Sequence, residues 1–269
     1  MSRDLSEEVA GVRSWYNLVA ENFGKSYSGA RGAFLKHCEE GLALELLQGP
    51  RERILDLGCG AGRLADSLSG CAAQVVGIDV SESMISVARR QPHAPNVGYC
   101  VMDATRSALK PASFDAVVSL GMFEYLADPS PFLKEILRVL RPGGRVIFTC
   151  HSKGSGLVRA WNKVGAMWKP RPKGVSQPLP ERDSFYRTVA HQPEQLLSLL
   201  REEGFVAADF RGFHFPPAWD GFVLSSAVPI GPLSRWGTSL AGGLDRWLGR
   251  LPATRWMSTL AMFTARKPS

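Results

Sequence analysis

The sequence of 269 residues lacks the features that would assign it to a membrane-spanning or secreted class. No uninterrupted apolar run approaches the ~18 residues of a membrane-spanning helix. Residues 1–10 are polar and acidic, so we expect no signal peptide. None of the five cysteines belongs to a C-x-x-C pair. An odd number of scattered cysteines predicts reduced thiols, a cytoplasmic location and no cysteine-based metal site.

The first half of the chain has no net positive charge, and the excess of basic side chains is concentrated in two later segments. Residues 1–135 carry 17 acidic and 13 basic side chains, whereas residues 136–180 carry nine basic and no acidic ones. Residues 210–269 add seven basic side chains against two acidic ones. Six tryptophans lie in the same late part of the chain: Trp161, Trp168, Trp219, Trp236, Trp247 and Trp256. This asymmetry predicts that the partner-binding surfaces are formed by the late segments.

The first 150 residues alternate short β-rich runs with helical patterns. Strands are expected at 53–57, 74–79, 97–101, 114–120 and 145–150, with helices at 62–68, 82–89 and 131–140 between them. Ser81 is a suitable N-cap for the helix that begins at Glu82. Alternation at this spacing predicts parallel strands joined by right-handed crossovers.

After residue 150 the alternation is interrupted and then resumes. Residues 151–185 are rich in proline, glycine and basic side chains, and an irregular stretch of this length is usually functional, often a lid. The later expected elements are a helix at 193–203, a strand at 205–210, an irregular stretch at 211–232, a helix at 233–248 and a strand at 258–265. The length of the chain suits one large domain with a cap.

The stretch ILDLGCGAG, residues 54–62, joins the first expected strand to the first expected helix. Its glycines form G-x-G-x-G, whereas a dinucleotide fingerprint would need a glycine where Arg63 stands. Asp56 lies beside the loop, where a carboxylate repels a pyrophosphate but attracts an amino group and a sulfonium cation. Asp79 ends the second strand, and its two oxygens can accept hydrogen bonds from both hydroxyls of a ribose.

Five motifs, in order along the chain, resemble the class I S-adenosylmethionine-dependent methyltransferases of the small-molecule type. They are ILDLGCGAGRLA, VVGIDVSESMISVARR, VMDATR, SFDAVVSLGMFEYLADP and LRVLRPGGRVIFT. The resemblance implies an α/β fold, a three-layer Rossmann-like sandwich around a seven-stranded sheet of order 3-2-1-4-5-7-6 with strand 7 antiparallel. It also implies a methyltransferase that uses S-adenosyl-L-methionine as its cofactor.

The resemblance further implies a set of cofactor contacts. Those near the methionine part would be Asp56, Gly58, Cys59, Gly60, Gly62 and Leu120; those near the ribose would be Asp79, Val80 and Met84; and those near the adenine would be Met102, Asp103 and Ala104. Several of these residues have a structural interpretation as well. Met84 fits a core position equally well, and Asp103 fits an ordinary loop acid.

Catalysis of methyl transfer depends mainly on holding a nucleophile in line with the activated methyl group. A general base is needed only if the acceptor arrives protonated. His151 follows the fifth strand at the carboxyl edge of the sheet, where open α/β sheets bind ligands, and His214 follows the sixth. Each of these two histidines fits either a base that faces the substrate or an imidazole that is packed or faces solvent. Glu124 and Tyr125 reach the same edge, but a lone acid there is weak support for a metal, and we predict none.

The remaining histidines are interpreted as structural or surface residues: His37, His93 and His191. At the N-terminus, Trp15, Tyr16, Phe23 and Tyr27 recur at near-helical spacing. They predict either a helix packed on the sheet or, as the resemblance implies, a helical lid over residues 1–45 in which Tyr16 lines the methyl-transfer site. Aromatic rings attract a sulfonium cation.

The substrate-specific parts of a single domain over residues 1–269 are expected to be this lid and two cap segments, 151–190 and 211–257. Their aromatic and basic side chains suit a hydrophobic small molecule with an anionic group, such as a quinone precursor, a polyketide, a carboxylic acid or a lipid. We expect oxygen as the methyl acceptor in preference to carbon, and carbon in preference to nitrogen.

Three alternatives use the same features differently. The amphipathic pattern at 233–248 suits either a membrane surface, with a peripheral lipid as substrate, or packing against the sheet. Basic segments also attract RNA, but no RNA-binding module is recognisable and the Asn/Asp-Pro-Pro-Tyr signature of nucleobase amine methyltransferases is absent. A protein that binds the cofactor without catalysis is the third alternative.

Overall fold

The computed structural model describes residues 5–23, 30–47, 49, 51–153, 185, 188–213, 247–248, 250–251, 258 and 260–269. Several sequence predictions lie outside these residues, namely those for His214, for Tyr27 and for almost all of the two cap segments. Within the described residues, no helix is both long enough and apolar enough to cross a membrane.

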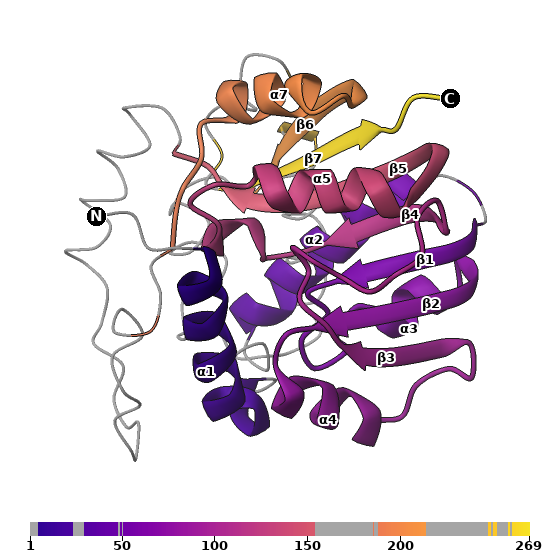
Figure 1. Cartoon of the computed structure of the whole chain (residues 1–269), viewed down its shortest axis with the longest axis vertical. Helices are drawn as coiled ribbons and strands as arrows, with labels where there is room; N and C mark the ends of the chain where they lie inside the picture. The colour runs from indigo at the N-terminus through magenta and orange to yellow at the C-terminus, as the bar shows by residue number, and fades with distance from the viewer. Residues whose placement is uncertain are drawn as a thin grey trace.

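A seven-stranded sheet in the order β3-β2-β1-β4-β5-β7-β6 forms the centre of the molecule (Figure 1). Its strands are β1 Arg51–Leu57, β2 Ala72–Asp79, β3 Val97–Val101, β4 Phe114–Ser119, β5 Leu140–His151, β6 Val206–Phe213 and β7 Leu260–Arg266. The first five strands pair in parallel, whereas β7 is antiparallel to both β5 and β6. The expected order and the reversed last strand are therefore confirmed.

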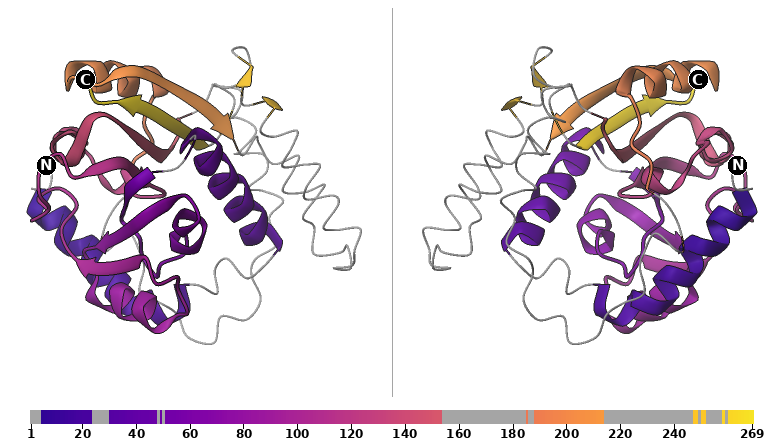
Figure 2. Two further views of the ribbon diagram at one scale, coloured as in Figure 1. Left: turned by 90° about the vertical axis from the view of Figure 1, so that its right-hand side faces the viewer. Right: turned by 90° about the vertical axis from the view of Figure 1, so that its left-hand side faces the viewer.

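Two helical layers cover the sheet, and side-chain alternation along the strands explains them. Ile54 packs into a cluster with α2 (Ala30–Leu47), α3 (Ala65–Ser69) and α4 (Glu82–Arg90), whereas Leu55 packs into a cluster with α5 (Ser130–Val139) and α7 (Pro193–Glu202). Successive strand residues point to opposite faces, so one buried apolar run contributes to both clusters. Figures 1 and 2 show the sheet between these two layers.

Two expected boundaries were wrong for local backbone reasons. The helix expected from residue 62 begins at Ala65, because Gly62 has a φ of 80°, outside the helical region. The fifth strand begins at Leu140, not at residue 145, because Pro142, Gly143 and Gly144 form an irregularity within β5. Gly143 has a φ of 72° and its N–H donates to the carbonyls of Lys267 and Pro268, so the C-terminal residues hold this irregularity in place.

Helix α1 (Leu5–Phe23) belongs to neither layer (Figure 1). It lies beside the carboxyl ends of the parallel strands and packs on α4. Val19 and Ala20 of α1 form a small buried cluster with Met84 of α4. The N-terminal helix is thus positioned at the edge of the sheet where the sequence predicts the site.

Candidate active site

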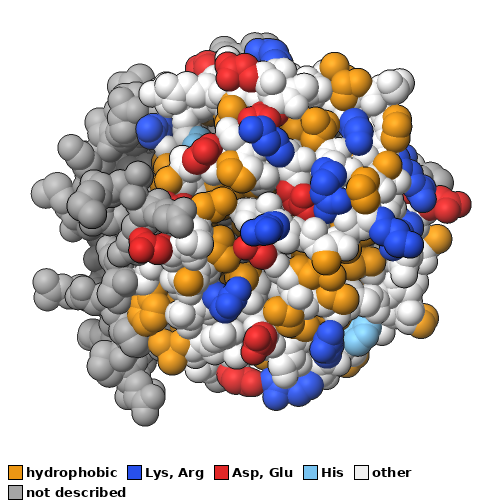
Figure 3. Space-filling model, in the orientation of Figure 1, with side chains coloured by type: hydrophobic (Ala, Val, Ile, Leu, Met, Phe, Trp, Pro, Cys, Tyr) orange, Lys and Arg blue, Asp and Glu red, His pale blue; other side chains and the backbone are white. Residues whose placement is uncertain are grey.

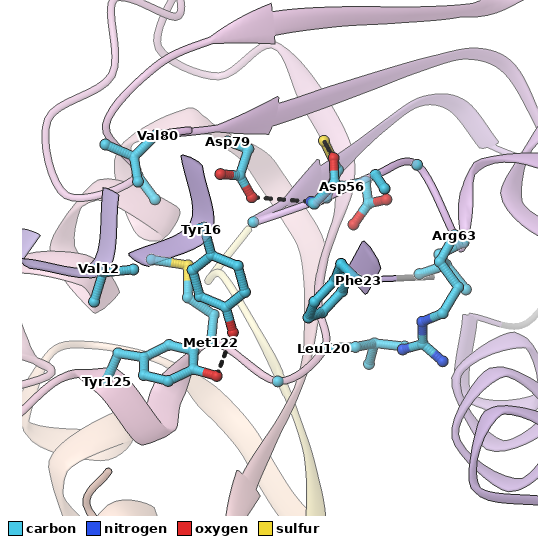
Figure 4. A pocket seen from close by; sticks show the side chains of 18 of the residues that line it. Val12, Tyr16, Phe23, Asp56, Arg63, Asp79, Val80, Leu120, Met122 and Tyr125 are labelled. Atoms are coloured by element: carbon cyan, nitrogen blue, oxygen red, sulfur yellow. Dashed lines mark hydrogen bonds between the residues drawn. The ribbon is translucent and has the colours of Figure 1, made fainter. Parts of the chain in front are cut away.

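A cavity of about 800 Å³ lies at the carboxyl ends of the parallel strands, and α1 forms one of its walls (Figure 4). Most residues that the sequence assigned to the site line it: Asp56, Gly58, Cys59, Gly60, Gly62, Asp79, Val80, Asp103, Ala104, Leu120, Tyr16 and His151. Below, the acidic side denotes Asp56, Asp79, Asp103 and the loop 58–62. The tyrosine side denotes Tyr16, Glu124, Tyr125 and His151.

The loop of the acidic side needs its glycines. Gly58, Gly60 and Gly62 all have positive φ values, of 77°, 53° and 80°, which L side chains rarely adopt. A Cβ on Gly62 would lie 2.6 Å from the Tyr99 hydroxyl, and one on Gly58 would lie 3.0 Å from the Met122 sulfur. Because these residues are glycines, the loop backbone can pack directly against Tyr99 of β3 and Met122 after β4. The same loop lines the cavity.

Asp79 holds the loop in place. Its Oδ2 accepts from the Gly60 N–H at 2.9 Å, and its Oδ1 accepts from the Ser81 N–H at 2.8 Å. Burial raises the pKa of this carboxyl, and the amide hydrogen bonds partly oppose the rise. Each carboxylate oxygen can accept a second hydrogen bond. The group is therefore anchored at the loop and still able to bind a ligand's hydroxyls.

Asp56 is the most deeply buried of the three acids on the acidic side. Only 3% of its surface is exposed, and its Oδ2 has no hydrogen-bond partner among the described residues. Burial raises its pKa to about 7; Arg63 opposes this shift, and Asp79 and Glu40 add to it. A buried oxygen without a donor is costly to retain. A cationic or hydrogen-bond-donating ligand group would supply what is missing.

The remaining predicted contacts near the ribose and adenine are Asp103, Met84 and Met102. Asp103 follows β3, and its Oδ1 accepts from the Thr105 N–H at 2.8 Å and from the Thr105 hydroxyl at 2.7 Å. Met84 is fully buried against α1, and Met102, directly after β3, packs against the core cluster that contains Leu55. Neither methionine is among the residues that line the cavity, so the structure places Met84 in its alternative, core position.

The tyrosine side combines residues from distant parts of the chain. The hydroxyls of Tyr16 and Tyr125 are 2.6 Å apart and their rings meet edge to face. His151 Nε2 lies 3.8 Å from Glu124 Oε1, with the histidine half exposed and the glutamate largely buried. Figure 4 shows Tyr16 and Tyr125 facing the same space as Asp79 and Asp56.

The backbone around His151 and Glu124 is fixed by residues 189–191, where the first cap segment ends. The His191 N–H donates to the His151 carbonyl at 2.9 Å, and the Val189 N–H donates to the Glu124 carbonyl at 2.6 Å. Burial lowers the pKa of His191, whose Nε2 lies 3.2 Å from the Phe123 carbonyl. These contacts fit the structural interpretation of His191. They also show that residues 189–191 hold the backbone at His151 and at Glu124.

Some lining residues were not anticipated. Tyr99 lies between Gly62 and Gly77, and a Cβ on Gly77 would come within 2.7 Å of its ring. No sequence pattern joins these three positions, because they meet only across β2 and β3. His93, predicted to be a surface residue, is exposed but stands at the rim, edge-on to Tyr99.

Among the described residues, no three His, Cys, Asp or Glu side chains gather in a way that could hold a metal ion.

Comparison with known proteins identifies the family. Residues 55–148 match a family described as a methyltransferase domain. A ubiquinone biosynthesis O-methyltransferase of Idiomarina loihiensis is 32% identical over 184 residues, which cover 65% of this chain and 69% of that protein.

Solved structures share the fold. A Thermotoga maritima protein described as a SAM-dependent methyltransferase, possibly a histamine N-methyltransferase, has a TM-score of 0.61 at 19% identity over 95% of this chain and 99% of its own. A Haemonchus contortus phosphoethanolamine N-methyltransferase, solved with S-adenosyl-L-methionine, has a TM-score of 0.57 at 18% identity over 94% of this chain and 60% of its own.

The described cavity fits such a cofactor. Its lining includes one arginine, Arg63, and six acidic side chains: Glu8, Glu39, Asp56, Asp79, Asp103 and Glu124. An acidic and aromatic lining suits a ligand that carries a sulfonium and an ammonium cation, and the buried Oδ2 of Asp56 lacks a donor of the kind an ammonium group provides. With its confirmed sheet order and the sequence match, this chain belongs to the class I methyltransferases, which transfer a methyl group from S-adenosylmethionine.

Proposed function

We propose that this methyltransferase acts on an oxygen atom of a hydrophobic small molecule, with a hydroxylated quinone precursor as the leading candidate. The observation that carries the proposal is the Glu124–His151 pair, which faces the same cavity as the three acids of the acidic side. A hydroxyl acceptor arrives protonated, so a base at this position has a chemical use. The name of the Idiomarina loihiensis relative, a ubiquinone biosynthesis O-methyltransferase, supports the same class of acceptor.

The acidic side would hold the cofactor. Asp79 would accept hydrogen bonds from the ribose hydroxyls, because it lines the cavity and a carboxylate has about four acceptor positions, more than its backbone amides use. Asp56 and the glycine loop would receive the methionine part, with Leu120 beside it. Asp103 and Ala104 would lie against the adenine. When bound, S-adenosylmethionine supplies a methyl group already activated for nucleophilic attack.

The tyrosine side would prepare the acceptor. His151 would take the hydroxyl proton as the oxygen attacks, and the nearby Glu124 carboxylate would stabilise the imidazolium that forms. The Tyr16 and Tyr125 hydroxyls, which meet at 2.6 Å beside the cavity, would orient an oxygen of the acceptor.

The lid over residues 1–45 and the caps at 151–190 and 211–257 would enclose the acceptor. Val12, Trp15, Tyr16 and Phe23 of α1 line the cavity and support the lid. The anionic substrate group and the membrane interpretation depend on cap residues that lie almost wholly outside the described ones, so they stay predictions from the sequence. On the face drawn in Figure 3, basic and acidic side chains of the described residues are interspersed, which does not favour RNA.

The proposal is tested by supplying purified protein and S-adenosylmethionine with matched acceptors. A catechol or dihydroxybenzoate with an apolar tail, its amine analogue and its fully O-methylated analogue would be compared by mass spectrometry. We expect a methyl-sized mass increment on the first compound alone. Methylation of the amine in preference to the phenol would overturn the choice of oxygen and leave the methyltransferase assignment intact.

A further inference from the structure

Asn17, in the middle of α1, contacts the end of a different helix. Its Oδ1 accepts from the Ser81 hydroxyl at 2.7 Å and from the Ser83 N–H at 3.2 Å. A backbone N–H can only donate, so the amide oxygen of Asn17 must be the atom that faces α4. Both acceptor positions of that oxygen are then used at the N-terminus of α4.

Ser81 extends this contact to the cavity. It is fully buried, and its hydroxyl caps α4 by accepting from the Met84 N–H at 3.1 Å. Its own N–H donates to Asp79 Oδ1 at 2.8 Å, and Asp79 Oδ2 accepts from the Gly60 N–H. A continuous series of hydrogen bonds therefore runs from α1 through the α4 cap to the glycine loop.

The neighbouring residue on α1 reaches the other side of the cavity. Tyr16 pairs its hydroxyl with that of Tyr125, and Figure 4 shows its ring projecting into the cavity. Consecutive helical residues are separated by about 100° around the axis, so Tyr16 and Asn17 can serve two surfaces at once. One short piece of α1 thus contacts the tyrosine side directly and the acidic side through Ser81.

We infer that Asn17 is a positioning residue for methyl transfer, which links occupancy of the Asp79 subsite to the placement of Tyr16. It does not line the cavity and acts through Ser81. A ligand that engages Asp79 stabilises the arrangement in which Ser81 and Asn17 are bonded, and α1 is thereby held over the site. Linkage requires the reverse effect as well: a docked α1 tightens the binding of the cofactor. The inference rests on the proposed contact between Asp79 and the ribose.

The test uses the full chain and S-adenosylhomocysteine, the demethylated product, so no acceptor is needed. Hydrogen–deuterium exchange of residues 5–23 is measured with and without this ligand, and its Kd is measured by calorimetry. In the wild type we expect the ligand to slow exchange in α1. In Asn17→Ala that protection should be lost and the Kd should rise about threefold to tenfold, the worth of the Asn17–Ser81 hydrogen bond, which is the one that leads to Asp79.

Asn17→Asp separates positioning from simple packing. A carboxylate oxygen can accept the same two hydrogen bonds, and a negative charge is favourable at the N-terminus of α4. This variant should retain both the protection and the affinity. Glu21→Gln is the matched control, because Glu21 also joins α1 to α4 through Arg90, but the pair is exposed and has no connection to Asp79. It should leave both measurements unchanged.

Two results would overturn the inference: Asn17→Ala that keeps wild-type protection and affinity even if its Tm falls, or Asn17→Asp that folds but behaves like the alanine variant. Asp79→Asn, measured alongside, distinguishes the two levels of the proposal. If Asp79→Asn does not weaken ligand binding, the proposed ribose contact fails. If it does and Asn17→Ala does not, only the positioning role of Asn17 fails.

Discussion

On the acidic side of the cavity, Asp56, Asp79 and Asp103 stand at or just after the ends of three parallel strands, and backbone amides of the loops that follow anchor two of them. On the tyrosine side, Tyr16, Glu124 and His151 come from α1, from the short 3-10 helix η2 (Phe123–Tyr125) and from the end of β5, far apart in the sequence. The first side is specified by short local segments. The second exists only because α1 and the segment at 188–191 fold back onto the strand ends.

This difference suits the two tasks. An acid anchored by backbone hydrogen bonds can receive an invariant ligand, because little has to move when the ligand binds. Side chains that come from separate elements can be altered one element at a time without disturbing the others. This suits an acceptor that differs among related enzymes. Variants that affect one side and spare the other test this division.

The largest expected effect is on the tyrosine side. In His151→Gln, kcat for a phenolic acceptor should fall by about 10² to 10⁴, the usual contribution of a general base. The Kd for S-adenosylhomocysteine should not change, because His151 is assigned to the other side. In alkaline buffer the deficit should shrink, since the phenol then loses its proton without help. A kcat loss that is the same at every pH, together with weaker ligand binding, would contradict the role of base.

The acidic side should respond in the opposite way. Asp79→Asn places an NH₂ group against one of the two backbone N–H donors, and it removes the charge offered to the ribose. We expect S-adenosylhomocysteine to bind about a hundredfold more weakly, the cost of roughly two charge-assisted hydrogen bonds, as measured by calorimetry. Asp209→Asn, on β6, removes an exposed acid that does not line the cavity, and should leave the Kd unchanged.

The loop of the acidic side is tested through its packing. Gly62→Ala and Gly49→Ala both force alanine into a positive φ, of 80° and 84°, but only at Gly62 does the new Cβ meet another atom, the Tyr99 hydroxyl. Gly62→Ala should therefore lose about 1–3 kcal/mol more unfolding free energy in urea than Gly49→Ala does. Removing the hydroxyl with Tyr99→Phe should recover part of that difference. Equal losses at the two glycines would show that the close approach has no energetic consequence.

The smallest predicted effect is a pH dependence that originates at Asp56. Its pKa of about 7 means that acidification protonates the carboxylate meant to attract the ligand's ammonium group. Affinity for S-adenosylhomocysteine should fall up to about tenfold for each pH unit below 7, and the fall should be absent in Asp56→Asn. A wild-type affinity that is constant between pH 5 and about 8 would contradict the ionised role of Asp56.

The same pKa has a consequence for stability, with a fixed sign. The folded protein holds this proton more tightly than the unfolded chain, whose carboxyl has a pKa near 3.8. The protonated carboxyl therefore stabilises the ligand-free fold at low pH, and this contribution is lost as the pH rises through about 7. Above that pH, Asp56→Asn should raise the Tm while it weakens ligand binding.

Local patterns predicted much of the fold. The third strand was predicted with its observed bounds, Val97–Val101, and Ser81 was predicted as the cap that the structure shows. These features depend on residues within a few positions of one another. The expected start of the fifth strand at residue 145 was wrong for the opposite reason: contacts with Lys267 and Pro268, far along the chain, hold residues 142–144 in β5.

The sequence by itself determined the alternation of strands and helices, the glycine loop and the positions of three acids along the chain, since each depends on local backbone geometry and on the spacing of apolar residues. Only the tertiary structure decided that Asp56 is buried without a donor, that Tyr99 lies beneath Gly62, that Tyr16 meets Tyr125 and that Asn17 bonds Ser81. Each of these depends on which residues of distant segments come within a few ångströms, and packing in three dimensions sets that distance.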